Sequence, residues 1–159
     1  HATYSQRTGL LYTPVIDACA TFRTYPTEFK ESLSYFGGEF TVAPSQVRGG
    51  AVKAYRPDGT LVWEWRHKFP IVASLLSTAG DLVFVGTPNG EFISLDARTG
   101  RQLWQFRTGT GIHSNPVTYS VGGKQYIAVP TGWGGWIKGF APNLIGHERG
   151  SAVFVFALP

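Results

Sequence analysis

The sequence predicts an all-β protein, and three observations support this prediction. Twenty glycines and ten prolines break short runs rich in Val, Thr, Phe, Tyr and Trp, which is the pattern of strands separated by tight turns. No segment shows the apolar periodicity of an amphipathic helix. A strand–turn–strand unit that ends on tryptophan occurs twice, about forty residues apart. This spacing favours a β-propeller, whose four-stranded blades bury their faces against one another.

The repeated unit accounts for the strands that we expect along the chain. Its copies run from Gly49 to Trp63 and from Gly90 to Trp104, each as alternating apolar residues, a polar turn and a returning strand. Further strands are expected at 71–79, 81–86, 112–119, 124–129 and 151–158. The last is almost continuously apolar, which is typical of a strand buried on both faces. The chain would then hold about two full blades plus a closing strand, too few to close a ring.

Composition excludes several classes of protein. The formal net charge of +4 comes from scattered Lys and Arg residues, without the basic run of a nucleic-acid binder, so no nucleic-acid partner is expected. No apolar stretch is long enough for a membrane-spanning helix, and the first residues lack the regions of a signal peptide. The sequence has no Met. We therefore expect this chain to be a piece cut from a longer precursor.

The single cysteine, Cys19, excludes an internal disulfide framework and a cysteine-rich metal site. A buried free thiol is the simpler interpretation. The alternative is a bond to a cysteine on the upstream part of the precursor, in an oxidising compartment. His67, His113 and His147 lack a ligand spacing, so we expect polar or hydrogen-bonded histidines and no metal site in this chain.

Residues 94–104 resemble the tryptophan-docking motif Ala-x-Asp-x-x-Thr-Gly-x-x-x-Trp of quinoprotein dehydrogenase propellers, with Ser94 in the first position. The copy that ends at Trp63 is one residue short in its turn and has Arg56 in place of the acid. The structural residues of the motif are Trp63, Asp96, Gly100 and Trp104. Similar segments follow in family order at 76–87, 109–112, 116–119, 132–135 and 149–156. The chain resembles the methanol and ethanol dehydrogenase branch of the pyrroloquinoline-quinone (PQQ) dependent family.

The resemblance implies that residues 1–159 are the C-terminal blades of an eight-bladed β-propeller, completed by a second chain or by the upstream part of the same precursor. Residues 20–47 would be a variable loop insertion that shapes substrate access or a dimer contact, with a surface packing loop as the default. A dimer of the two-chain unit is a further expectation.

The resemblance also implies the chemistry. Such enzymes are periplasmic, hold PQQ with Ca²⁺ or a lanthanide, and oxidise alcohols, polyols, sugars or aldehydes, and they pass electrons to a cytochrome c. The cofactor performs the redox chemistry. No motif for the catalytic base or the metal ligands occurs here, so both are expected on the larger N-terminal chain. A non-catalytic propeller scaffold for protein assembly is the alternative function.

Two segments are expected to face the cavity. Val72, Ala73 and Ser74 stand where relatives carry a cofactor-contacting Trp-Gly-Gly motif, so Val72 would widen the pocket unless it is ordinary strand core. The substrate cavity residues would be Trp133, Gly134, Gly135 and Trp136. The alternative for this run is a structural glycine turn with two core aromatics. His1 would lie beside the cofactor or belong to a frayed end.

Overall fold

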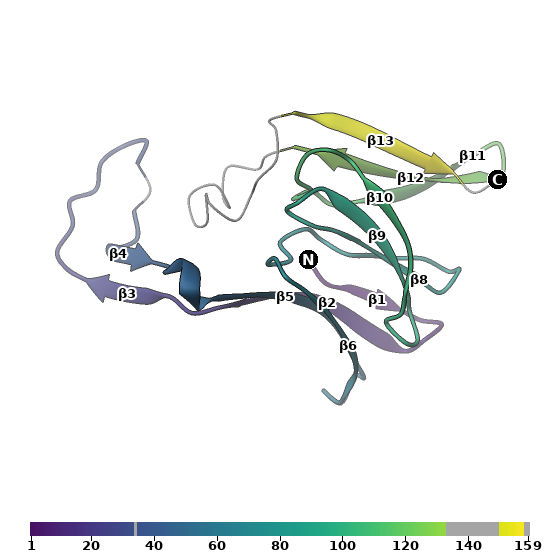
Figure 1. The fold of residues 1–159 in the computed structure, drawn as a ribbon, viewed down its shortest axis with the longest axis horizontal. Coiled ribbons are helices and arrows are strands. Elements are labelled where there is room, and N and C mark those ends of the chain that lie inside the picture. Colours follow the sequence, from purple (N-terminus) through teal and green to yellow (C-terminus); the bar gives the residue numbers. More distant parts are fainter. Residues whose placement is uncertain (34, 133–149, 158–159) are drawn as a thin grey trace.

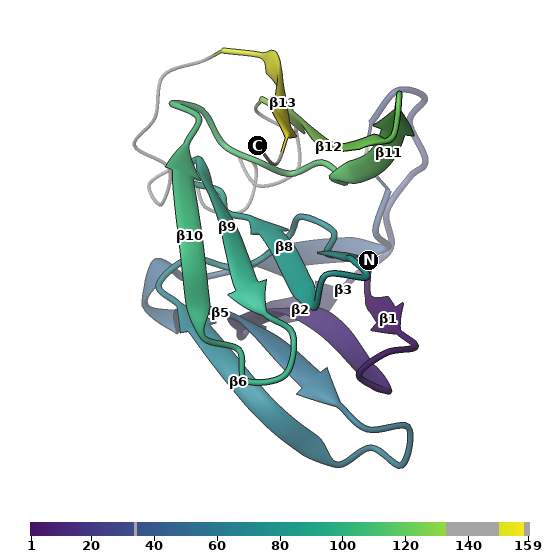
Figure 2. The same cartoon turned by 90° about the vertical axis from the view of Figure 1, so that its right-hand side faces the viewer.

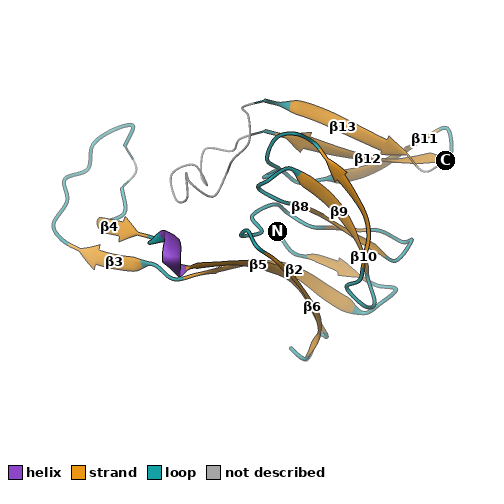
Figure 3. Cartoon of the chain, in the orientation of Figure 1, coloured by secondary structure: helices purple, strands orange, loops and turns teal. Residues whose placement is uncertain are grey.

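The computed structural model describes residues 1–33, 35–132 and 150–157, whose regular secondary structure is almost wholly β-strand (Figures 1 and 3). Within these ranges, thirteen strands and one short 3₁₀ helix form three larger sheets and a small hairpin. The larger sheets are stacked face to face in Figure 1, as blades are. The all-β prediction is confirmed. No helix in the described ranges has the length and apolar character needed to cross a bilayer.

The first sheet has four antiparallel strands in the order β1-β2-β5-β6. Glycines with positive φ close its two hairpins, with φ of 67° at Gly9 and 87° at Gly59, a region that glycine enters at little cost. The strands are β1 (Thr3–Ser5), β2 (Leu10–Ala18), β5 (Val47–Tyr55) and β6 (Leu61–His67). Trp63 lies on the outermost strand.

The second sheet repeats this arrangement in the order β7-β8-β9-β10. Its strands are β7 (Leu76–Ser77), β8 (Leu82–Gly86), β9 (Glu91–Asp96) and β10 (Gln102–Arg107). The strand expected at 71–79 is reduced to the two residues of β7, and residues 68–75 connect the sheets. Strand β9 is buried along nearly its whole length, because it lies between the first and third sheets.

The third sheet consists of β11 (Val117–Val121), β12 (Lys124–Thr131) and β13 (Ala152–Ala157), in that order. The prediction that the last strand is buried on both faces is wrong for this structure. Phe154 and Phe156 pack against the second core cluster, whereas Val153 and Val155 are 66% and 52% exposed. Within the part of the chain that the structure describes, only one face of β13 is covered.

The segment expected as a variable loop contains regular structure. Strands β3 (Thr21–Thr24) and β4 (Gly38–Thr41) form a hairpin, and the 3₁₀ helix η1 (Pro44–Gln46) leads into β5. The hairpin projects from the ends of β2 and β5 (Figure 1). Cys19 precedes it and is exposed, which contradicts the expected burial of this thiol, because a projecting hairpin offers no core to cover it.

The core lies between the sheets and has two clusters. Tyr12 and Trp63 of the first sheet meet Ile93 and Leu95 of the second in one cluster. The other lies between the second and third sheets and includes Phe84, Phe92, Ile112 and Val129. Strands β1 and β11 lie on one side in Figure 2, and β6 and β10 lie on the other. We call the side of β1, β7 and β11 the inner edge, since these strands begin each sheet.

Candidate functional site

Trp63 joins the first sheet to the second. It is 8% exposed, and its Nε1 donates a hydrogen bond to the carbonyl oxygen of Ala97 at 3.0 Å. The Tyr12 hydroxyl donates to the same carbonyl at 3.0 Å. The indole covers Gly100, where a Cβ atom would lie 2.6 Å from Trp63 Cε3. Trp63 therefore docks on the turn of the following blade.

The acid and threonine of the motif build the turn that receives the indole. One carboxylate oxygen of Asp96 accepts hydrogen bonds from the Thr99 hydroxyl at 2.9 Å and from the amide groups of Arg98 and Thr99 at 3.0 and 2.9 Å. The Thr99 hydroxyl, followed by these amides, holds the pKa of Asp96 below its usual value. Gly100 closes the turn with φ of 73°, so its missing side chain leaves room for Trp63.

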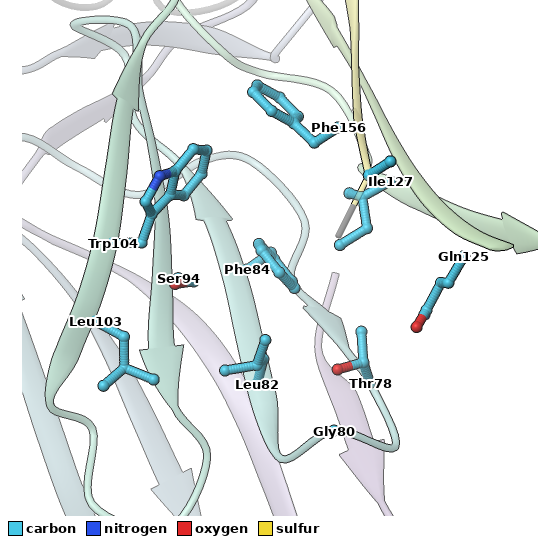
Figure 4. Close-up of a pocket in the computed structure, with 11 residues that line it drawn as sticks. Thr78, Gly80, Leu82, Phe84, Ser94, Leu103, Trp104, Gln125, Ile127 and Phe156 are labelled. Carbon is cyan, nitrogen blue, oxygen red and sulfur yellow. The ribbon is translucent and has the colours of Figure 1, made fainter. Parts of the chain in front are cut away.

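Trp104 has a different environment. It is 40% exposed and makes edge contacts with Phe92 and Phe156, with ring centroids 6.2 and 5.3 Å apart. A cleft of about 460 Å³ opens beside it, lined mainly by apolar groups of the second and third sheets (Figure 4). Thr78 and Gly80, at the β7–β8 turn, form part of its wall. This cleft therefore lies at the end of β7 away from Ser74.

A buried polar network also joins the first and second sheets. His67 Nδ1 accepts from the Phe69 amide at 3.2 Å, so Nε2 carries the proton and donates to Glu91 at 3.0 Å. The side chains of His67 and Glu91 are only 10% and 12% exposed. Gln105 and Arg107 also donate to the Glu91 carboxylate, at 3.1 and 3.4 Å. Burial favours the protonated acid, but hydrogen bonds led by Asn89 and His67 outweigh it and lower the pKa of Glu91.

At the inner edge, polar groups from the starts of successive sheets meet. The His1 backbone nitrogen donates to Ser74 Oγ at 2.8 Å, and the His1 carbonyl accepts from the Leu75 amide at 3.1 Å. The Ser74 hydroxyl donates to Asn115 Oδ1. His1 is thus held by the second sheet rather than frayed. The sequence did not single out Asn115, because no local pattern links it to a residue 41 positions away.

The other two residues of the expected cofactor segment lie beside Ser74 in the connection before β7. Val72 is partly buried and Ala73 is fully buried, and neither belongs to a strand. Ser74 is therefore the member of this segment with a polar group at the inner edge.

The loop from Thr108 to Pro116 is anchored on the second sheet. The Ile112 amide donates to the Thr87 carbonyl at 3.0 Å. The Ile112 side chain is fully buried and fills the space beside Gly86, where a Cβ atom would lie 2.2 Å from Ile112 Cγ2. The rigid packing of Ile112 fixes the loop that carries Asn115.

His113 in the same loop has a buried Nε2 atom without a hydrogen-bond partner in the described ranges. Burial lowers the pKa of His113, so the neutral ring is favoured. An unpaired buried nitrogen of this kind costs free energy.

Several expected residues are outside the described part of the chain, namely Trp133, Gly134, Gly135, Trp136 and His147. Among residues 1–33, 35–132 and 150–157, no three His, Cys, Asp or Glu side chains cluster as metal ligands would. The expectation that the metal ligands and catalytic base lie upstream stays a prediction.

The stacked sheets and the docking of Trp63 define the class of protein: consecutive blades of a propeller, in which a tryptophan of one blade docks on a turn of the next. Residues 46–127 match the family described as PQQ, "Glucose/ethanol/alcohol dehydrogenase, beta-propeller domain", and these residues make up more than half of the chain. The chain belongs to this family, which confirms the resemblance drawn from its motifs.

Named relatives come from the quinoprotein branch. The quinoprotein alcohol dehydrogenase PedE of Pseudomonas putida is 38% identical over 98% of this chain, and the quinoprotein ethanol dehydrogenase of Pseudomonas aeruginosa is 36% identical over 98%. Each match covers 26% of the relative, so the chain spans about a quarter of their length. A europium-containing methanol dehydrogenase superposes with a TM-score of 0.85 at 30% identity, covering 99% of this chain and 32% of that one.

The inner edge has the donor chemistry that PQQ needs. This cofactor carries carboxylates and quinone oxygens, which are hydrogen-bond acceptors. Ser74 and Asn115 are neutral polar groups, and none of the hydrogen bonds described for them involves an acidic side chain. The residues present therefore fit part of a binding site for such a group.

Proposed function

We propose that this chain is the C-terminal part of a PQQ-dependent dehydrogenase that oxidises alcohols. The observation that supports the proposal most is the similarity of almost the whole chain to proteins named quinoprotein alcohol dehydrogenases. A protein named 1-butanol dehydrogenase (quinone), from Thauera butanivorans, is 33% identical over 99% of the chain. Alcohols are thus the substrate class that we propose ahead of polyols, sugars and aldehydes.

In this proposal the chain supplies structure and binding. Bound PQQ, with Ca²⁺ or a lanthanide, supplies the electron acceptor for alcohol oxidation. Ser74 and Asn115 would form part of the wall that holds it, and the docked Trp63 and the anchored Ile112 would keep this wall rigid. Two proteins named lanthanide-dependent methanol dehydrogenases, similar to this chain, support a lanthanide as one metal to test.

We further propose that the larger N-terminal part carries the catalytic base, that electrons pass to a cytochrome c, and that the enzyme works in the periplasm as a two-chain unit or a dimer of it. A protein-assembly scaffold needs no donor-lined inner edge. If the chain were such a scaffold instead, its protein partner would be sought at the open cleft beside Trp104.

The test is alcohol oxidation by the full-length protein. Apoprotein is reconstituted with PQQ and either Ca²⁺ or a lanthanide and assayed with an artificial electron acceptor. We expect turnover of short primary alcohols that requires both PQQ and the metal, with slower turnover of polyols and sugars. Tight PQQ binding without oxidation of any of these substrates would contradict the proposed activity.

A further inference from the structure

Asn115 and Ser74 form a contact between two sheets at the inner edge. Ser74 lies just before β7, and Asn115 lies just before β11. Both residues thus precede the first strand of a sheet. Ser74 is 6% exposed, whereas Asn115 is exposed. The buried hydroxyl therefore supports a side chain that remains accessible.

The hydrogen bonds give the Asn115 amide a direction. Ser74 Oγ accepts from the His1 backbone nitrogen at 2.8 Å, and its hydroxyl proton goes to Asn115 Oδ1. An asparagine amide has one acceptor oxygen and two N–H donors. Because Ser74 occupies the oxygen, the accessible part of the amide is its donor nitrogen. No partner of Asn115 Nδ2 occurs among the described residues.

A fixed amide of this kind selects for hydrogen-bond acceptors. A ligand carboxylate or quinone oxygen would gain a hydrogen bond from Nδ2, while a ligand donor would meet the N–H groups unfavourably. Rotation of the amide would place its nitrogen against the Ser74 hydroxyl and break the bond to Oδ1. The serine thus reduces the cost of ordering the amide when a ligand binds.

We propose that Asn115 is a cofactor-contacting residue, which donates a hydrogen bond from Nδ2 to an acceptor oxygen of the quinone cofactor, and that Ser74 is its positioning residue. This inference rests on the proposed function, since it takes PQQ as the ligand. The sequence indicated residues 72–74 as the cofactor-contacting segment. The proposal adds to it a second cofactor contact, made by Asn115 just before the third sheet.

The test measures PQQ binding by full-length apoprotein, with the metal held constant and bound quinone followed by its absorbance. We expect Asn115→Ala to raise the Kd about tenfold, which corresponds to about 1.4 kcal/mol. Asn115→Asp should raise it about a hundredfold, because a carboxylate replaces the donor and repels an anionic ligand. Ser74→Ala should weaken binding by a smaller factor, about threefold, and Ser74→Thr should restore it.

Two controls separate binding from folding. Gln102 is an exposed side-chain amide on β10, outside the inner edge, so Gln102→Ala should leave the Kd unchanged. The thermal unfolding midpoint of each Asn115 variant, measured on the apoprotein, should match that of the wild type, since Asn115 is exposed. A Ser74 variant that binds more weakly at an unchanged midpoint supports the positioning role even if an Asn115 variant fails to fold.

The outcomes distinguish the two proposals. If wild-type apoprotein takes up PQQ and both Asn115 variants bind it with the wild-type Kd, the inference is wrong and the proposed function stands. If the wild-type protein itself takes up no PQQ under any metal condition, the proposed function fails, and the inference fails with it.

Discussion

At the residue scale, the difference between glycine and alanine decides whether Trp63 can dock. Gly100 has φ of 73° and lies beneath the indole, whereas Gly59 has φ of 87° and has no heavy atom within 4 Å of where its Cβ would be. The two positions share the conformational requirement and differ in the space available. They form a matched pair of positions for measuring the contact between the Trp63 indole and Gly100.

We expect Gly59→Ala to destabilise the protein by about 1–2 kcal/mol through positive φ alone. Gly100→Ala should cost about 1–3 kcal/mol more, because its methyl group would overlap the indole. Thermal unfolding of the two variants, with tryptophan fluorescence as the signal, measures the difference. Equal losses of unfolding free energy in the two variants would show that the indole does not rest on Gly100.

At the scale of elements, the loop that carries Asn115 depends on the packing of Ile112 against β8. A methyl group at Gly86 would lie 2.2 Å from Ile112 Cγ2, whereas at Gly80 it would lie 3.8 Å from the nearest atom, Thr78 Oγ1. We expect Gly86→Ala to cost about 1–3 kcal/mol and Gly80→Ala to be close to neutral. Hydrogen exchange in 108–116 should rise only for Gly86→Ala, and unchanged protection there would contradict the packing account.

The contact between β6 and β9 should depend on pH. Because the pKa of Glu91 is lower in the folded protein, its stabilising effect is present above the usual glutamate pKa and is lost as the pH falls through the folded value. We expect Glu91→Gln to cost about 1–3 kcal/mol near pH 7. This free-energy difference between the variant and the wild type should shrink as the pH falls below the usual glutamate pKa, as measured by unfolding at a series of pH values. A constant difference would exclude the ionised carboxylate as its cause.

At the scale of the whole molecule, the sequence predicts the features that recur in each blade. It does not predict the side-chain contacts that join one sheet to another. The spacing of Trp63 and Trp104 predicted blades, and the turn at 96–100 predicted docking, because both follow from local patterns. The pairs His67–Glu91 and Ser74–Asn115 join residues 24 and 41 positions apart that lie in, or just before, strands of different sheets. Their spacing carries no periodic signal, so only the stacked fold reveals them.

The expectations that failed also have a physical cause at this scale. The apolar run at 151–158 and the thiol of Cys19 were expected to be buried, since apolar residues and free cysteines usually are. Whether a given residue is covered depends on which sheets surround it. The described residues leave Val153 and Cys19 exposed, a property that no local pattern contains.

The central claim is that these sheets are the blades of a propeller that holds PQQ. The most direct measurement is the absorbance spectrum and intact mass of the full-length protein, purified without added cofactor and repeated after denaturation and filtration. We expect a near-ultraviolet quinone band in the native protein that passes into the filtrate on denaturation, together with a bound metal ion. A protein without this band, which also takes up no added PQQ with Ca²⁺ or a lanthanide, would contradict the account.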